Sequence, residues 1–169
     1  WKKLYNKVFI YAYNNGNKLF KNGIDIMKKE YLGFDNMMPD IDKISAIICN
    51  RTGWKIETVA GFVDEAIFFE LLKGKKFPSS DIIRLSSRFY DKYKNTNVKN
   101  ELSYTPEPDI FHDVFGHAPF LTDHRYTKFL ADLGKLGLEL ITDKRGLGEE
   151  LVDHNLKRLQ NLAWWTYEF

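Results

Sequence analysis

The spacing of apolar residues along the chain predicts a mainly helical protein. From Trp1 to Ala12 they recur at intervals of three and four, the periodicity of one helix face, and Asn14-Asn15-Gly16 breaks the pattern. Two further helices are predicted in the first third, one over 18–31 that ends near Gly33 and one from about Asp40 to a stop at Gly53. A helix over 65–73 is predicted between the N-cap Asp64 and Gly74. Two more are predicted from Pro106 or Pro108 to Gly116 and Pro119, and from the cap Asp123 to about Leu140. A final helix follows Gly146 and Gly148, and its predicted apolar face is Leu151, Leu159, Leu162 and Trp165.

Two short segments have the composition of strands. Residues 54–59 alternate loosely, are rich in β-formers and are followed by Gly61, while Ile82–Leu85 is a second apolar run. The polar residues of 88–103 predict a long exposed loop. About six helices against two short strands predict a mainly α fold, that is α+β with a small β element.

Composition narrows the class of protein. Hydrophobic residues make up 44% of the 169 residues, and 25 basic against 23 acidic side chains leave a net charge of +2. This balance argues against a nucleic-acid partner, and the chain has neither an apolar run of membrane-spanning length nor a signal-peptide pattern. The single cysteine, Cys49, cannot form an internal disulfide and is interpreted as a core residue. We therefore expect a cytoplasmic monomer.

The length suits one domain, so residues 1–169 are expected to form a single catalytic domain. The chain starts at Trp1 and stops at Phe169, directly after the aromatic-rich segment 164–167, whereas natural ends are usually polar. We expect it to be a fragment of a longer domain.

The histidines are the strongest candidates for a functional site. His112 and His117 are five residues apart, which on a regular helix turns the two rings about 140° from each other. They converge only if the helix is ending, as Gly116 and Pro119 suggest. Spacing alone favours two partly exposed histidines bonded to neighbours. His124 and His154 are interpreted as surface residues.

A metal site would need a third ligand, and Asp113, Asp123, Asp153 and Glu168 are the carboxylates at hand. Two imidazoles and one carboxylate suit non-haem Fe(II) and also catalytic zinc. Glu168 is attractive because its aromatic setting demands a partner for a carboxylate, although it could equally point to water. Other enzyme classes find no support: there is no GxGxxG or P-loop, and Ser79, Ser80, Ser86 and Ser87 lie in no nucleophile elbow.

Residues 104–119, with the sequence YTPEPDIFHDVFGHAP, resemble the iron-binding signature of the pterin-dependent aromatic amino acid hydroxylases. Within that family they resemble the bacterial phenylalanine 4-hydroxylases more than the animal enzymes. The ending WWTYEF resembles the segment that carries the family's carboxylate ligand, and shorter matches follow in order along nearly the whole chain.

This resemblance assigns site residues. It implies His112, His117 and Glu168 as ligands of Fe(II). It implies a tetrahydropterin, tetrahydrobiopterin or a related one, contacted by Gly61, Phe62, Val63, Phe68 and Asp113. It implies an aromatic amino acid bound by Arg84, Thr105, Pro108 and Trp164, with Arg84 paired to the substrate carboxylate.

The implied activity is a monooxygenase that uses O2 to hydroxylate L-phenylalanine to L-tyrosine. Two departures from the family pattern are the 19 residues between Arg84 and Tyr104 and the 51-position interval from His117 to Glu168, both longer than expected. The family's catalytic domain also continues beyond a Glu-Phe of this kind. Two alternatives stay open: a degenerate member that binds an aromatic amino acid without turnover, and a zinc hydrolase using the same three ligands.

Overall fold

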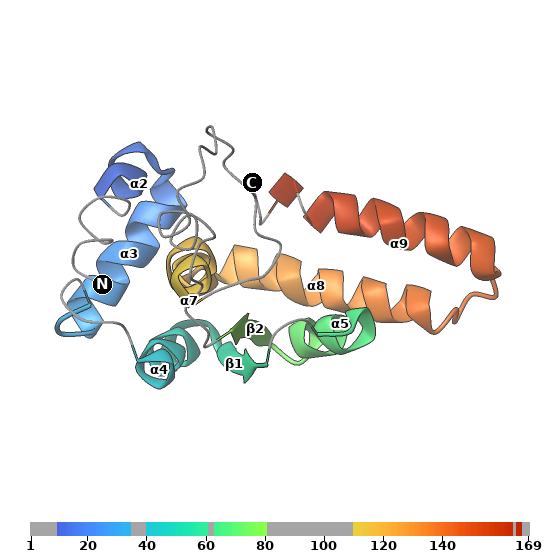
Figure 1. The fold of residues 1–169 in the computed structure, drawn as a ribbon, viewed down its shortest axis with the longest axis horizontal. Helices are drawn as coiled ribbons and strands as arrows, with labels where there is room; N and C mark the ends of the chain where they lie inside the picture. Colours follow the sequence, from blue (N-terminus) through green and yellow to red (C-terminus); the bar gives the residue numbers. More distant parts are fainter. Residues whose placement is uncertain (1–9, 35–39, 61–62, 81–109, 164, 167–169) are drawn as a thin grey trace, which may run out of the picture.

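The computed structural model describes residues 10–34, 40–60, 63–80, 110–163 and 165–166, and these form a helical protein with one small sheet (Figure 1). The helices are α2 (Ile10–Asn15), α3 (Lys18–Glu30), α4 (Ile41–Thr52), α5 (Glu65–Lys73), α7 (Ile110–His112), α8 (His124–Ile141) and α9 (Glu149–Ala163). A π-helical turn, η2 (Asp113–His117), and a 3-10 turn, η3 (Phe120–Thr122), lie between α7 and α8, and the strands are β1 (Lys55–Val59) and β2 (Lys76–Ser80). The predicted fold class is confirmed.

Helix ends with local capping signals lie where the sequence predicts them. Asp64 accepts a hydrogen bond from the Ala66 N–H at the start of α5, and Gly74 ends that helix. Gly53 ends α4 with φ +74°, a left-handed conformation that favours glycine. Such ends depend on one or two residues, so the sequence alone determines them.

The break predicted at Asn14-Asn15-Gly16 is confirmed at its last residue. Asn14 and Asn15 still lie within α2, which ends at Asn15, and Gly16 lies outside the helix. The Asn15 side-chain amide donates a hydrogen bond to the Tyr11 carbonyl at 2.8 Å. This bond turns the side chain back along the helix, which therefore continues to its last residue before Gly16.

The sheet pairs β1 with β2 in parallel, and its second strand is not the predicted one. Lys55 lies opposite Lys76 and Val59 opposite Ser80. Pro78 lies inside β2, and a two-stranded sheet leaves one side of each strand unpaired, where a residue without an N–H is tolerated. The strand predicted at 82–85 and the loop predicted at 88–103 lie outside the described residues. Helix α5 connects the two strands, so 55–80 form one β-α-β unit.

Helix α8 lies between α5 and α9 (Figure 1) and packs closely on α5. A Cβ placed at Gly134 would lie 2.5 Å from the Lys73 backbone nitrogen, and one at Gly137 would lie 2.4 Å from the Phe69 ring. Only glycine permits this approach of the two helices. Leu130 and Leu133 of α8 are buried in the same core.

The apolar face predicted for α9 is mostly wrong. Leu159 is buried, but Leu151 is 51% exposed, Leu162 47% and Trp165, just beyond the helix, 78%. The helix instead packs through Leu156, Leu159 and Ala163, which share a face at helical spacing. The predicted face left out Leu156 and has only Leu159 in common with the face that packs.

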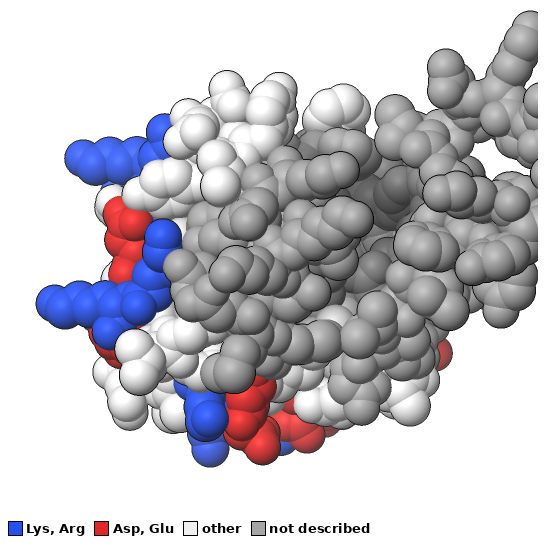
Figure 2. All heavy atoms as spheres, turned by 60° about the vertical axis from the view of Figure 1, so that its left-hand side comes forward, with Lys and Arg blue, Asp and Glu red and all other residues white. Residues whose placement is uncertain are grey.

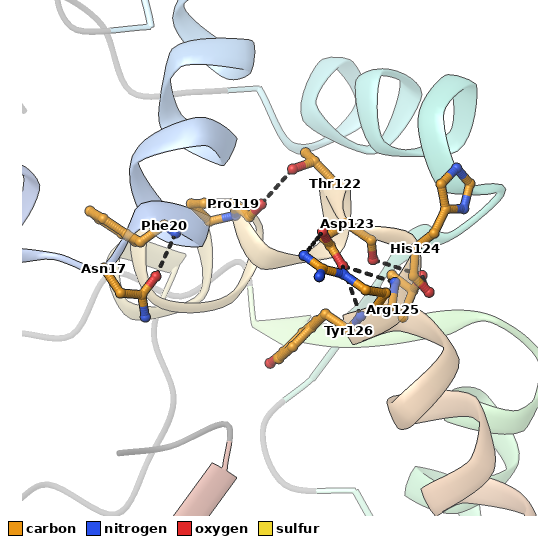
Figure 3. A network of polar contacts seen from close by, with 9 residues as sticks. Asn17, Phe20, Pro119, Thr122, Asp123, His124, Arg125 and Tyr126 are labelled. Atoms are coloured by element: carbon orange, nitrogen blue, oxygen red, sulfur yellow. Dashed lines mark hydrogen bonds and ion pairs between the residues drawn. The ribbon is translucent and has the colours of Figure 1, made fainter.

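Side-chain caps fix the starts of α3 and α8 (Figure 3). Asn17 accepts a hydrogen bond from the Phe20 N–H at the start of α3, at 2.9 Å. At the start of α8, Asp123 accepts bonds from the N–H groups of Arg125 (2.8 Å) and Tyr126 (3.1 Å). These caps fix the first turn of each helix, and the Asp123 cap sets the direction in which α8 leaves the turns that follow the histidines.

The described surface carries mixed charges. Figure 2 shows Lys and Arg side chains next to Asp and Glu side chains, with no broad area of one sign on the described part of that face. Among the described residues, none of the helices has both the length and the hydropathy that a membrane crossing requires. His124 and His154 are exposed, as predicted, and Cys49 is half-buried on α4.

Candidate metal centre

Of the two histidines of interest, His112 directly precedes a π turn and His117 is its last residue. The Ala118 N–H donates to the Asp113 carbonyl at 2.9 Å, a bond that spans five residues instead of the four of an α-helix. Residues five apart are therefore one turn apart here, and the 140° divergence expected for a regular helix does not arise. The π turn brings His112 and His117 to the same side.

The rings of His112 and His117 face each other at close range. Their Nε2 atoms are 2.9 Å apart, and the ring planes are nearly perpendicular at 75° with centroids 4.7 Å apart. His117 is only 3% exposed. The interpretation favoured by spacing alone, two partly exposed histidines bonded to their neighbours, is therefore wrong for His117 and for the direction of both rings.

Apolar side chains anchor this turn in the core. Ile110, Val114 and Ala118 are buried, and the Phe115 ring packs edge-on against Phe34 with centroids 5.7 Å apart. The pattern of buried residues leaves the two histidines on the remaining face. The Phe77 ring of β2 covers one side of His117, at a centroid distance of 4.9 Å. His117 is thus held by packing as well as by the backbone.

Asp113 adds a buried carboxylate to the pair. It is 5% exposed, and its Oδ2 accepts hydrogen bonds from the Ser79 hydroxyl at 3.0 Å and from the Ser80 N–H at 2.9 Å. These bonds compensate the cost of removing a carboxylate from water. The possible ligand atoms of His112, Asp113 and His117 all lie within 4.8 Å of one another.

This donor set fits a divalent transition metal. Imidazole nitrogens and a carboxylate are the ligands that Fe(II) and Zn(II) sites use. A cation that holds two nitrogens at about 2.1 Å and at a right angle separates them by about 3.0 Å, close to the observed 2.9 Å. Without a metal, one Nε2 must donate a proton to the other. The geometry of the pair therefore suits two adjacent positions in a coordination sphere.

The structure describes two more of the predicted site residues. Phe68 on α5 is half-buried and packs edge-on against Phe69 with centroids 5.8 Å apart, and Val63 is half-buried just before α5. Seven others lie outside the described residues: Gly61, Phe62, Arg84, Thr105, Pro108, Trp164 and Glu168. The site that the structure describes is therefore the histidine pair with Asp113.

The sequence did not predict a role in this site for three residues of β2, namely Phe77, Ser79 and Ser80. Ser79 and Ser80 were considered only as nucleophiles, and Phe77 was not considered a neighbour of His117. Their contacts reach across 33 to 40 residues of chain, and no local pattern predicts such pairings. The alternation of Phe77 and Ser79 around Pro78 was the available signal for a strand face, but Pro78 argued against a strand.

Comparison with known protein families agrees with this geometry. The family model described as biopterin-dependent aromatic amino acid hydroxylase matches residues 1–169. The chain belongs to this hydroxylase family. The signature over 104–119 was thus correctly interpreted, and the histidine pair lies within it.

Curated hydroxylases from bacteria are similar over most of the chain. Phenylalanine-4-hydroxylase of Caulobacter vibrioides is 33% identical over 100% of this chain and 48% of its own length. Phenylalanine-4-hydroxylase of Pseudomonas aeruginosa is also 33% identical, over 83% of this chain and 45% of its own length. The chain thus spans about half the length of the curated relatives it matches.

Solved hydroxylase structures share the fold. The apo phenylalanine hydroxylase of Colwellia psychrerythraea superposes with a TM-score of 0.74 at 25% identity, covering 98% of this chain and 53% of the other. The Chromobacterium violaceum enzyme with bound iron(III) and 7,8-dihydrobiopterin gives a TM-score of 0.73 at 27% identity, over 98% and 51%. A second structure of that enzyme holds iron and phenylalanine, with a TM-score of 0.73 at 25% identity over 98% and 50%.

Proposed function

We propose that this protein is an iron- and tetrahydropterin-dependent monooxygenase that converts L-phenylalanine to L-tyrosine. The observation that carries the proposal is the His112–His117 pair, with Nε2 atoms 2.9 Å apart, inside a chain that matches the hydroxylase family along its whole length. The curated relatives bear the name phenylalanine-4-hydroxylase, and solved relatives hold iron with a biopterin or with phenylalanine. These names support phenylalanine over other aromatic amino acids.

The proposed iron ligands are His112, His117 and Glu168. The buried π turn holds the two imidazoles in place before any metal binds, so little conformational freedom remains to be lost on binding. When bound, Fe(II) together with the reduced pterin supplies the activation of O2 that ring hydroxylation requires. Asp113 supplies a buried negative charge beside this site, which favours a cation there.

The remaining proposed contacts follow the family signature. The pterin is assigned to Gly61, Phe62, Val63, Phe68 and Asp113, and the amino acid to Arg84, Thr105, Pro108 and Trp164. Phe68 is half-buried on α5 and packs edge-on against Phe69, a setting that suits an aromatic residue beside a ligand. An arginine can bind the substrate carboxylate with two parallel hydrogen bonds.

The protein is further proposed to act as a monomer in the cytoplasm on a free amino acid. The support for the location is the single cysteine, which forms no internal disulfide and suits a reducing compartment. Size-exclusion chromatography coupled to light scattering measures the oligomeric state directly, and a dimer would contradict the proposed monomer.

The activity test uses purified protein supplied with Fe(II), a tetrahydropterin and L-phenylalanine in air. We expect tyrosine to form in step with pterin oxidation, and His117→Ala to abolish both. His154→Ala, an exposed histidine on α9, is the matched control and should keep full activity. Phenylalanine binding without tyrosine formation would instead identify a binding protein without turnover. Zinc in the purified protein, with no gain of activity on adding Fe(II), would favour hydrolytic chemistry.

A further inference from the structure

Strand β2 contacts the π turn through alternate residues. Phe77 and Ser79 are two positions apart and so project from the same face of the strand. The Phe77 ring packs on His117 at 4.9 Å, and the Ser79 hydroxyl donates to Asp113 at 3.0 Å. One strand face therefore touches both a histidine of the pair and the carboxylate beside it.

The hydrogen bonds to Asp113 are shielded from water. Ser79 is 2% exposed, Ser80 1% and Asp113 5%. A hydroxyl and an N–H that donate to a buried carboxylate have no competing solvent, so these charge-assisted bonds are stronger than exposed ones. Pairing of β2 with β1 fixes the strand that carries both donors.

The two donors to Asp113 differ in whether a side-chain substitution can remove them. Ser80 donates through its backbone, and no side-chain substitution removes that bond, whereas Ser79 donates through its hydroxyl. Both bonds end on Oδ2 of Asp113. The terminal torsion of an aspartate is broad, so loss of one of these donors lets the carboxylate rotate more freely.

We propose that Ser79 is a positioning residue of the metal centre. Its hydroxyl, together with the Ser80 N–H, fixes the orientation of the Asp113 carboxylate next to His112 and His117. Ser79 itself does not contact the metal and acts only through Asp113. This inference rests on the proposed function, because it assumes that the histidine pair binds a divalent metal. It predicts that a residue on a strand 34 positions away in sequence tunes the metal affinity.

The test measures binding of Co(II), a spectroscopic substitute for Fe(II), to the purified protein and its variants. Ser79→Ala should weaken Co(II) binding about three- to tenfold, less than the roughly 10–100-fold seen for residues bonded directly to a ligand, because Ser79 acts through Asp113 and Ser80 still holds that carboxylate. It should also alter the visible Co(II) spectrum. In a protein that already carries Asp113→Asn, adding Ser79→Ala should change neither the affinity nor the spectrum further. A purely structural role for Ser79 would lower thermal stability in both backgrounds and leave the Co(II) spectrum unchanged.

A matched pair of variants distinguishes the effect of the Ser79 hydrogen bond from the effect of side-chain volume at this position. Ser79→Thr and Ser79→Val have side chains of the same shape, and only threonine keeps the donor. We expect Thr to bind Co(II) more tightly than Val, and this comparison decides the matter should Ser79→Ala fail to fold. Equal binding by Thr and Val, or wild-type binding by Ser79→Ala, would overturn the role of Ser79 while leaving the metal centre intact. Failure of the wild-type protein to bind Co(II) would refute the proposed function and this inference with it.

Discussion

The contact between α5 and α8 predicts that adding one methyl group at Gly134 destabilises the protein. The Cβ of an alanine at this position would lie 2.5 Å from the Lys73 backbone nitrogen, 2.7 Å from the Phe69 carbonyl oxygen and 2.9 Å from the Leu72 Cβ. Carbon atoms in ordinary contact are about 3.5–4.0 Å apart. Two of the three neighbours are backbone atoms that cannot rotate away, so the two helices must separate by about 1 Å.

The magnitude is a balance of two effects. Forcing extra volume into a packed core typically costs about 1–3 kcal/mol, and the rigid neighbours of Gly134 place it near about 3 kcal/mol. Alanine is the better helix former by about 1 kcal/mol, which offsets part of this cost. We therefore expect Gly134→Ala to lower the free energy of unfolding by about 2 kcal/mol.

The neighbouring residue Lys135 supplies a control of opposite sign. Its side chain is 60% exposed and forms a long surface ion pair with Asp132 at 3.9 Å, which both Lys135→Ala and Lys135→Gly remove. Here alanine should be more stable than glycine by about 1 kcal/mol. Urea unfolding followed by far-ultraviolet circular dichroism gives all of these free energies. If alanine proves the more stable residue at position 134 as well, the close approach of α5 and α8 is refuted.

Three further outcomes are expected. Burial raises the pKa of the Asp123 carboxyl, but hydrogen bonds from Arg125 and Tyr126 lower it more, and the net pKa is below its ordinary value. Asp123→Ala should thus cost about 1 kcal/mol at neutral pH, and urea titrations should show this difference shrinking as the pH falls below about 4. Metal at 100 times its dissociation constant should stabilise the wild type by about 2.7 kcal/mol in thermal unfolding, but not His117→Ala. Leu130→Ala, at a fully buried position of α8, should cost about 2–5 kcal/mol in urea, and the same change at the 43% exposed Leu136 about 0.5 kcal/mol or less.

The sequence predicted helix ends well because their causes are local. Helix α5 lies at 65–73 between Asp64 and Gly74, and α8 begins after Asp123, as their capping residues indicate. A side-chain oxygen that accepts the first N–H groups of a helix acts within three residues, so its effect can be read directly from the chain. The same holds for the left-handed glycine at position 53.

The strand β2 could not be found in this way. Residues 76–80 contain a proline and two serines, a composition that argues against a strand. Its stability comes from parallel pairing with β1 and from contacts of Phe77 and Ser79 with the π turn, all of which are distant in sequence. Tertiary contacts here outweigh local propensity.

The histidine pair was predicted only in part. The residues His112 and His117 were identified from the sequence, but a regular helix predicted that their rings diverge. The convergence depends on a single backbone bond from Ala118 to Asp113 that spans five residues. Gly116 and Pro119 suggested that the helix ends here, which would let the rings converge, and the resemblance to a known family implied that both histidines bind one metal. The residue types of 113–117 do not predict the π bond itself.

The extra residue of this π turn is accommodated within the turn itself. Deleting one residue between His112 and His117, with Asp113 kept, would leave a spacing of four, which already places two rings on one face of an α-helix. A turn of five residues would become a turn of four, so the residues after it would keep their direction relative to His112. Leu121 would stay in the core, and α8 would present the same face to α5. Loss of one residue here should therefore be better tolerated than loss of one residue within α8, where every later side chain of the helix would rotate by about 100°.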